Sequence, residues 1–395
     1  MPHSLDPMLA LVLLLAVVAT LWAALGVFSV ARVRLRAGVP SRRLSELPPV
    51  TVLKPLCGVD ADLEANLRTF FEQDHPRFEL VFGVQGASDP AAEIVRRLRA
   101  EYPQVVARLV VHDGGRGLNP KVSNLRAMLE HAAQHDVIVV SDSNVAVARD
   151  YLRELATELA RPNTGLVTSP ISGEGERTLG AALEALQLNG PVAAGVAIAS
   201  ELARHTIVVG KSMMFRRSEL ARLGGLESVA EVLAEDYVIG RMYLEAGYAV
   251  RLARTPVRNI VRAATVRTFS DRMLRWGMIR IRLAPAAFFL EPLASPLVVA
   301  AVALATGTLG AWPLWWAVAV MLVRDAATTL LMRGPRGLTT LPLVLVRDVI
   351  VLGTWCVTPF HKHVRWRGRR VRVSAGTRLY AAEPSAAPAP ARVEG

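Results

Sequence analysis

Cysteine is scarce in this 395-residue chain, which has two, Cys57 and Cys356. Two cysteines so far apart give no disulfide framework and no metal-ligand spacing. The chain also lacks Gly-x-Ser-x-Gly and His-Glu-x-x-His motifs, so it has no sequence signature of a serine hydrolase or a zinc peptidase. The glycine-rich stretch at 114–117 has no Walker lysine-serine pair, and a P-loop is therefore not predicted.

Acidic residues are also few relative to basic ones, because 46 Lys and Arg against 34 Asp and Glu give a formal net charge of +12. Such an excess could indicate nucleic-acid binding. Here it gathers beside apolar segments, at Arg32, Arg34, Arg36, Arg42 and Arg43, and from Lys362 to Arg372. This placement predicts contact with a membrane surface and no nucleic-acid partner.

Apolar sequence is abundant instead. Hydrophobic residues make up 52% of the chain and charged residues 20%, which fits a soluble domain joined to a few membrane spans. Residues 8–30 form an unbroken apolar run, long enough to cross a hydrocarbon core of about 30 Å. No Lys or Arg precedes it, so residues 1–31 are predicted to be a retained transmembrane anchor rather than a cleaved signal peptide. The arginines that follow predict a cytoplasmic location for the next segment.

Residues 45–267 alternate strand-like apolar runs with helical patterns. Strands are predicted at 50–53, 78–84, 105–111 and 137–140, with helices at 62–72, from about 90, and at 121–133. Continuous apolar strands separated by helices predict an α/β domain with a parallel sheet covered on both faces. Lys54, Asp89 and Asp142 come just after predicted strands, and ligands of such sheets bind at the carboxyl ends of the strands. A site is therefore predicted there.

The C-terminal third changes character. Residues 268–290 mix arginines with apolar residues and predict an interfacial helix. Within 291–360, spans are predicted near 292–309 and 312–332, whereas 338–360 carries Arg347 and Asp348 near its middle. Because charges inside a membrane are costly, that last segment is predicted to be re-entrant. Residues 361–380 are predicted to be a basic cytoplasmic segment, and residues 381–395, rich in Ala and Pro, a disordered tail.

The acidic residues suggest metal and base chemistry. Asp142, with Asp89 on a neighbouring strand, could hold a divalent cation, for which oxygen ligands favour Mg or Mn. Each could instead be a residue that starts a helix. Glu235-Asp236 stands inside apolar sequence, where one acid could serve as a general base or both could mark an acidic helix N-terminus.

The basic residues suggest phosphate recognition. Arg272, Arg275 and Trp276 place two guanidinium groups on adjacent helical turns, which suits phosphate, or alternatively a membrane-surface helix. Lys121 and Asn124 open a predicted helix and are candidates to face the nucleotide, as is Lys54.

Together these marks resemble one family. Seven segments in order resemble the ceramide glucosyltransferases, glycosyltransferase family 21, in their bacterial form. They are Val-Leu-Lys-Pro-Leu-Cys-Gly-Val-Asp (52–60), Arg-Thr-Phe-Phe-Glu-Gln-Asp-His-Pro (68–76), Asn-Pro-Lys-Val-Ser-Asn-Leu (119–125), Ser-Asp-Ser-Asn (141–144), Val-Gly-Lys-Ser-Met-Met-Phe-Arg-Arg (209–217), Leu-Ala-Glu-Asp-Tyr (233–237) and Arg-Met-Leu-Arg-Trp (272–276).

The resemblance implies a GT-A fold and an inverting mechanism. Asp89 would contact the nucleotide, Asp142 the metal, and Asp236 would be the base. Arg272, Arg275 and Trp276 would hold the pyrophosphate and the acceptor. Asn144 stands where a D-x-D motif would have its second carboxylate, so one protein carboxylate is expected at the metal.

The implied reaction moves a hexose, glucose in the family, from a UDP-sugar to the primary hydroxyl of ceramide. The implied location is a bacterial inner membrane that the chain crosses several times, with the catalytic domain in the cytoplasm. The acceptor is expected to enter sideways from the bilayer, with its tails against Leu283, Phe288 and Phe289. Two alternatives remain open, namely a hopanoid lipid as acceptor and a non-catalytic membrane scaffold.

Overall fold

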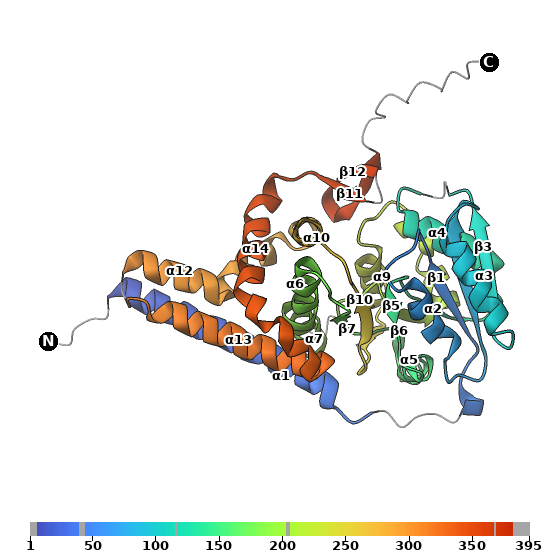
Figure 1. The fold of residues 1–395 in the computed structure, drawn as a ribbon, viewed down its shortest axis with the longest axis horizontal. Helices are drawn as coiled ribbons and strands as arrows, with labels where there is room; N and C mark the ends of the chain where they lie inside the picture. Colours follow the sequence, from blue (N-terminus) through green and yellow to red (C-terminus); the bar gives the residue numbers. More distant parts are fainter. Residues whose placement is uncertain are drawn as a thin grey trace, which may run out of the picture.

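The computed structural model describes residues 6–38, 44–114, 117–202, 206–307, 309–366 and 369–381. Residues 382–395, nearly all of the predicted disordered tail, lie outside the described residues, as do Arg42 and Arg43. An α/β domain occupies one side of the molecule, and long apolar helices extend from the other (Figure 1).

A seven-stranded sheet forms the centre of the α/β domain. Across the sheet its strands are β3 (Val106–His112), β2 (Phe78–Gln85), β1 (Val50–Pro55), β4 (Val137–Val140), β8 (Met213–Arg216), β6 (Thr164–Thr168) and β9 (Ala249–Leu252). The four strands predicted from the sequence are present, and they pair in parallel. Strand β8 runs antiparallel to both of its neighbours, so the sheet is mixed but mostly parallel. The predicted fold class is thereby confirmed.

Helices cover both faces of this sheet because consecutive strand residues point to opposite sides. Val52 packs on one face and Leu53 on the other. The first face carries α2 (Leu63–Phe71), α3 (Ala91–Glu101) and α5 (Tyr151–Leu159). The second carries α4 (Pro120–His131), α8 (Arg217–Arg222) and α9 (Glu235–Glu245). The site described below lies at the carboxyl edge of this layered unit.

An apolar helix that the sequence analysis did not predict lies beside the sheet. Helix α6 (Leu179–Gln187), a π-helical turn (Leu188–Val192) and α7 (Ala193–Glu201) follow one another without a break. The segment is long and apolar enough to cross a membrane, yet most of it is buried inside the protein. It starts after β7 (Ile171–Glu174), which pairs with β10 (Val257–Ile260) in a small sheet completed by β5 (Val145–Ala146).

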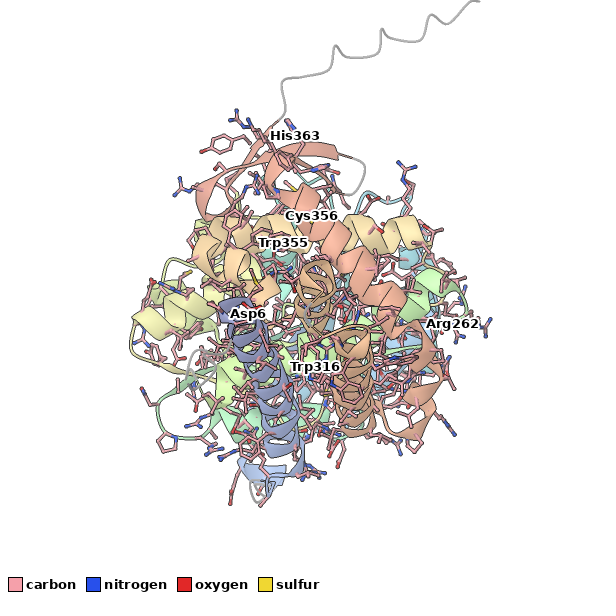
Figure 2. All side chains as sticks on the ribbon, turned by 90° about the vertical axis from the view of Figure 1, so that its left-hand side faces the viewer. Asp6, Arg262, Trp316, Trp355, Cys356 and His363 are labelled. Atoms are coloured by element: carbon pink, nitrogen blue, oxygen red, sulfur yellow. The ribbon has the colours of Figure 1, made fainter. Side chains whose placement is uncertain are left out.

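The apolar helices α1 (Pro7–Leu35), α12 (Pro296–Thr306) and α13 (Trp312–Arg333) lie side by side and project from the α/β domain (Figure 1). Large apolar side chains on α1, among them Leu14 and Leu21, are exposed on its outer surface. Figure 2 looks onto the ends of these helices, where the indole of Trp316 donates to Thr20 Oγ1 on α1 at 3.2 Å. A long exposed apolar surface of this kind is typical of helices that face lipid.

Four helices within the described residues are long and apolar enough to span a membrane, or five if one bent pair counts as a span. The bend of 62° lies between residues 285–294 and 296–306, not in the segment predicted to be re-entrant. That segment consists of a 3₁₀ turn (Pro335–Leu343), α14 (Val344–Val357) and a second turn (Thr358–Phe360). Shorter 3₁₀ turns occur at Leu44–Glu46, Leu226–Val229, Glu291–Ala294 and Ala375–Thr377.

The predicted interfacial segment forms α10 (Val266–Leu283) and α11 (Pro285–Leu290). Thr265 caps α10, since its hydroxyl accepts from Thr268 N at 3.0 Å. Helix α10 contacts α6 and α14 and leads from the α/β domain to the long apolar helices (Figure 1). Phe288 of α11 is fully buried and stacks on Trp355 of α14, so it is not available to lipid tails, whereas Phe289 is exposed.

The predicted basic segment is a folded element. It forms a three-stranded antiparallel sheet of β11 (His363–Trp366), β12 (Arg369–Val373) and β13 (Leu379–Ala381), visible around His363 at the top of Figure 2. Val371, Val373 and Leu379 pack on Leu233 and Met278. Backbone hydrogen bonds join this sheet to residues 231–233, with Leu233 N donating to Thr377 O at 2.9 Å and Leu379 N to Glu231 O at 2.8 Å. The C-terminal sheet therefore clamps the loop that enters α9.

Candidate active site

A cavity of about 350 Å³ opens at the carboxyl ends of β1 and β4, between the central sheet and α10. Its wall contains both charged and apolar side chains. The charged residues are Asp60, Lys121, Asp142, Lys211, Glu235, Asp236, Arg272 and Arg275, and the apolar ones include Ile171, Val209, Leu233, Trp276 and Ile279. Such a pocket suits a ligand with one anionic and one apolar part.

Lys121 connects two of the acids. Its Nζ lies 2.9 Å from Asp142 Oδ1 and 3.1 Å from Glu235 Oε1, and it donates to Gly210 O at 2.9 Å. Burial disfavours the ammonium charge, but Asp142 and Glu235 outweigh this effect and raise the pKa of Lys121. Burial also opposes the charge of Asp142, yet Lys121 and Lys211 hold the pKa of its carboxyl well below its usual range. Both groups are therefore charged at neutral pH.

Two more lysines surround Asp142. Lys54, fully buried at the end of β1, donates to Asp142 O at 2.5 Å and lies 3.8 Å from the Phe70 ring centroid. Lys211 Nζ lies 3.4 Å from Asp142 Oδ2 and donates to Asn144 Oδ1 at 2.8 Å. Burial lowers the pKa of both lysines. Two ammonium groups thus contact the Asp142 carboxylate and a third lysine contacts its backbone oxygen, so cationic groups are available here for an anionic ligand.

Lys211 was missed as a site residue in the sequence analysis. It precedes β8, and β8 is antiparallel to its neighbours. The start of an antiparallel strand lies at the same edge as the ends of the parallel ones. A search confined to residues after strands therefore overlooks it, although it stands in the family-like segment 209–217.

Asp236 lies in the first turn of α9 and faces the cavity. Its Oδ2 accepts from Gly210 N and its Oδ1 from Tyr237 N, both at 2.8 Å. Burial first, and the neighbouring charge of Glu235 second, raise the pKa of Asp236 to about 6. A carboxylate with a pKa nearer neutrality is a better proton acceptor, so the geometry is compatible with a general base.

Gly210 permits this arrangement because it has no side chain. A Cβ there would lie 2.6 Å from Asp236 Oδ2 and 3.0 Å from its Cγ. Asn119 supports the same region from α4, where it caps the helix through Lys121 N and Val122 N. Its amide donates to Val232 O at 2.7 Å and to Glu235 Oε2 at 3.2 Å. The Asn-Pro-Lys start of α4 thus fixes both Lys121 and the entry to α9, where the two acids lie.

Helix α10 brings Arg272, Arg275 and Trp276 to the opposite wall of the cavity. Arg272 forms an ion pair with Glu184 of α6. Burial first, and the charge of Arg275 second, lower the pKa of Arg272 to about 10, which leaves it protonated at neutral pH. Within the part of the chain that the structure describes, the Arg275 guanidinium has no hydrogen bond or ion pair. Its donors are therefore free for a ligand.

Three predicted site residues lie outside the cavity lining, and one of them, Lys54, contacts Asp142 O from the end of β1 as described above. Asp89 accepts from Ala91 N at 2.9 Å at the start of α3, and both its oxygens accept from Gly58 N. Asn124 donates to Gly83 O at 2.8 Å and to Leu56 O at 3.3 Å, which ties the ends of β1 and β2 together. In this structure Asp89 starts a helix and Asn124 supports the sheet edge. Their direct contact with the nucleotide stays a prediction.

Few side chains at the predicted metal site could serve as metal ligands. No cluster of three or more His, Cys, Asp or Glu side chains suited to a metal occurs among the described residues. Asp142 supplies one carboxylate and Asn144 one amide oxygen, and lysines contact both. Mg²⁺ is commonly held by one or two carboxylates together with substrate phosphates. These residues fit a cation shared with a bound diphosphate, but not a cation held by protein alone.

Known proteins resemble this chain along most of its length, since residues 11–379 match the family described as glycosyl transferase family 21. The chain belongs to glycosyl transferase family 21. This glycosyltransferase is 30% identical over 250 residues to ceramide glucosyltransferase 3 of Caenorhabditis elegans, and the match covers 63% of this chain and 54% of that protein. It is 35% identical over 128 residues to the ceramide glucosyltransferase of Komagataella phaffii, covering 30% and 25% of the two chains. The match thus spans about half the length of the nematode relative.

Two solved structures are similar in outline. One is the mannosyltransferase PcManGT from Pyrobaculum calidifontis in complex with GDP-Man and Mn²⁺, with a TM-score of 0.49, 22% identity, and coverage of 87% of this chain and 99% of that chain. The other is residues 1–349 of S. aureus TarS in complex with UDP-GlcNAc, with a TM-score of 0.39, 12% identity, and coverage of 85% and 99%. With its mixed, mostly parallel sheet, the α/β domain of this family 21 member is GT-A-like.

Proposed function

We propose that this protein is an inverting glycosyltransferase that moves a hexose from a UDP-sugar to the primary hydroxyl of a ceramide-type lipid at the membrane surface. The observation that carries the proposal is the position of Asp236. It lies in one cavity with two lysines and two arginines, and the helix that closes the cavity continues into the membrane-associated region. The ceramide acceptor and the UDP donor come from the relationship to ceramide glucosyltransferases.

The reaction is one displacement. The acceptor oxygen bonds to C1 of the sugar as the bond between C1 and the diphosphate breaks, and the hydroxyl proton passes to Asp236. Attack from the face opposite UDP inverts the anomeric centre. Lys121, Lys211 and Arg275 meet the negative charge that develops on the leaving diphosphate, in a site where burial strengthens such interactions. UDP leaves into water, and the glycolipid remains in the bilayer.

The acceptor reaches the cavity along α10. Trp276 and Ile279 form part of its apolar wall, and the chain then leads to the exposed side chains of Phe289 and Leu290 on α11. A lipid lying at this surface keeps its hydroxyl in the headgroup layer and its tails on apolar groups. Holding the hydroxyl beside the donor supplies the positional advantage that a dilute lipid otherwise lacks.

Purified enzyme in detergent is expected to transfer hexose from one of UDP-glucose, UDP-galactose, UDP-GlcNAc or UDP-glucuronate to ceramide, and not to water-soluble sugars. Mass spectrometry identifies the product, and NMR of the anomeric proton tests inversion. Product with a hopanoid polyol but none with ceramide would transfer the assignment to the alternative acceptor. Binding of UDP without transfer to any lipid would favour the non-catalytic scaffold.

A divalent cation, Mg²⁺ or Mn²⁺, is proposed to bind with the donor at Asp142 and Asn144, and it would neutralise part of the diphosphate charge. Lys121 and Lys211 must then release the two oxygens of Asp142. Chelation is expected to stop transfer and weaken UDP binding, both restored by added Mn²⁺ or Mg²⁺. In Asp142→Asn the affinity for UDP, measured by calorimetry, should no longer depend on the cation. Full turnover by exhaustively chelated enzyme would refute the metal proposal.

The α/β domain and the C-terminal sheet are proposed to lie on the cytoplasmic side, where UDP-sugars are made and where the basic residues after α1 favour retention. A single cysteine in place of Ala375, in a background lacking the exposed Cys57 and Cys356, is expected to resist a membrane-impermeant maleimide in intact cells. It should react once the cells are permeabilised. Labelling of intact cells would reverse the proposed orientation of this sheet.

A further inference from the structure

Glu184 is a buried acid for which the reaction described above has no role. It lies on α6, its side chain is 1% exposed, and one of its oxygens pairs with Arg272 on α10. The other oxygen, Oε2, has no hydrogen-bond partner among the described residues. A buried carboxylate without a cationic partner destabilises the folded state. The Arg272 side chain is therefore held in the conformation that pairs with Glu184.

Apolar packing beside the pair limits the conformations that the Arg272 side chain can adopt. Leu183, next to Glu184 on α6, packs against Phe269 and Met273, which flank Arg272 on α10. Arg272 therefore lies beside a buried apolar contact between α6 and α10. The Arg272 guanidinium pairs with Glu184, and Arg272 also lines the cavity.

The position of α6 is itself fixed from the membrane side. One turn after Glu184, Gln187 accepts from Arg347 of α14 at 3.4 Å. Arg347 is fully buried and pairs with Asp325 of α13, which is also fully buried, at 2.5 Å. A Cβ on Gly190, in the π-helical turn, would lie 2.4 Å from Asp325 Oδ1, so the turn approaches this pair closely. Buried charges thus dock α6 onto the apolar helices.

We propose that Glu184 is a positioning residue that holds the Arg272 guanidinium in the cavity, where it contacts the diphosphate of the nucleotide donor. Glu184 itself touches neither donor nor acceptor. The buried Arg347–Asp325 pair holds Glu184 in turn, which links the anion site to the membrane-side helices. The ligand chemistry rests on the proposed function, whereas the connection between Glu184 and Arg272 rests on their geometry.

The test is a double-mutant cycle on the dissociation constant of UDP, measured by calorimetry on the full-length protein. Glu184→Gln is expected to weaken UDP binding about tenfold, and Glu184→Asp to restore part of the loss. In an Arg272→Met background, Glu184→Gln should have no further effect on UDP binding. Glu176→Gln serves as a control, because it removes a comparable ion pair with Arg333 away from the cavity and should leave UDP affinity unchanged.

Several outcomes would decide the matter. A lower Tm in Glu184→Gln with unchanged UDP affinity, or losses that add in the double variant, would make Glu184 a structural residue and overturn the proposal. Because UDP binding needs no acceptor, the cycle remains readable if the wild type glycosylates no lipid. In that case the proposed function fails, and the positioning role stands if Glu184→Gln weakens UDP binding in the wild-type background but not in the Arg272→Met background. Conversely, a wild type that transfers hexose, with a Glu184→Gln variant that binds UDP normally, would support the proposed function and overturn the positioning role.

Discussion

Replacement of Asp236 by Asn is expected to lower kcat by about 10²- to 10⁴-fold, the range that general-base catalysis contributes. Asn has nearly the same shape and can still accept from Gly210 N, but it cannot take the acceptor proton. The dissociation constant of UDP should stay close to that of the wild type. Steady-state transfer assays and calorimetry measure the two effects separately. Asp271→Asn, an exposed substitution on α10, is the matched control and should keep full activity.

The same residue predicts a pH dependence. Burial and Glu235 raise the pKa of Asp236 to about 6, and only the unprotonated carboxylate accepts a proton. The wild-type kcat/KM is therefore expected to fall as the pH drops through about 6. The apparent value belongs to the interacting pair, so Glu235→Gln should shift this limb to lower pH. Turnover near the wild-type level in Asp236→Asn would remove Asp236 from the mechanism.

Replacement of Arg275 by Met is expected to lower kcat/KM by about 10²- to 10³-fold, as loss of a preorganised donor to a developing charge does. UDP binding should weaken as well, and Arg275→Lys should recover only part of the loss because it lacks the forked geometry. Stability should hardly change, since Arg275 has no hydrogen bond or ion pair within the described residues. Thermal unfolding in detergent measures the stability of each variant, and the transfer assay measures its kcat/KM.

Arg272→Met provides the contrast. It strands Glu184 in a buried position, so the free energy of unfolding should fall by about 3 kcal/mol in addition to any loss of activity. If the Arg275 variant is stable but inactive and the Arg272 variant is destabilised, Arg275 acts mainly on the ligand and Arg272 also stabilises the fold. Normal kcat/KM in Arg275→Met would remove this arginine from the anion site.

The first half of the sheet could be predicted because each strand is a mostly apolar run followed by a polar residue. That pattern placed Lys54 and Asp142 at one edge, where the structure brings them together. Asp89 fits the same pattern but caps α3, because a carboxylate at a strand end satisfies helix N–H groups as readily as it binds a ligand.

Other features depend on tertiary pairing that no local pattern reveals. The direction of β8 decides that Lys211 joins the site. Glu184 is the one acid in an apolar helix, and its partner Arg272 lies 88 residues later in the sequence. The charges at 347–348 predicted a re-entrant segment. Arg347 pairs with Asp325 and donates to Gln187, and Asp348 lies 3.6 Å from Arg324, and only the packing of α13 and α6 provides these partners.

The backbone clamp between Leu233 and Thr377 has a consequence for the order of biosynthesis. The strands of the central sheet and all the charged residues of the cavity have been translated by residue 276, long before the chain is complete. The loop at 231–233, which leads into the first turn of α9 with Glu235 and Asp236, gains its clamp only when residues 377–379 have emerged from the ribosome. By then α12, α13 and α14 have all been made. Completion of the loop that enters α9 thus follows synthesis of the long apolar helices.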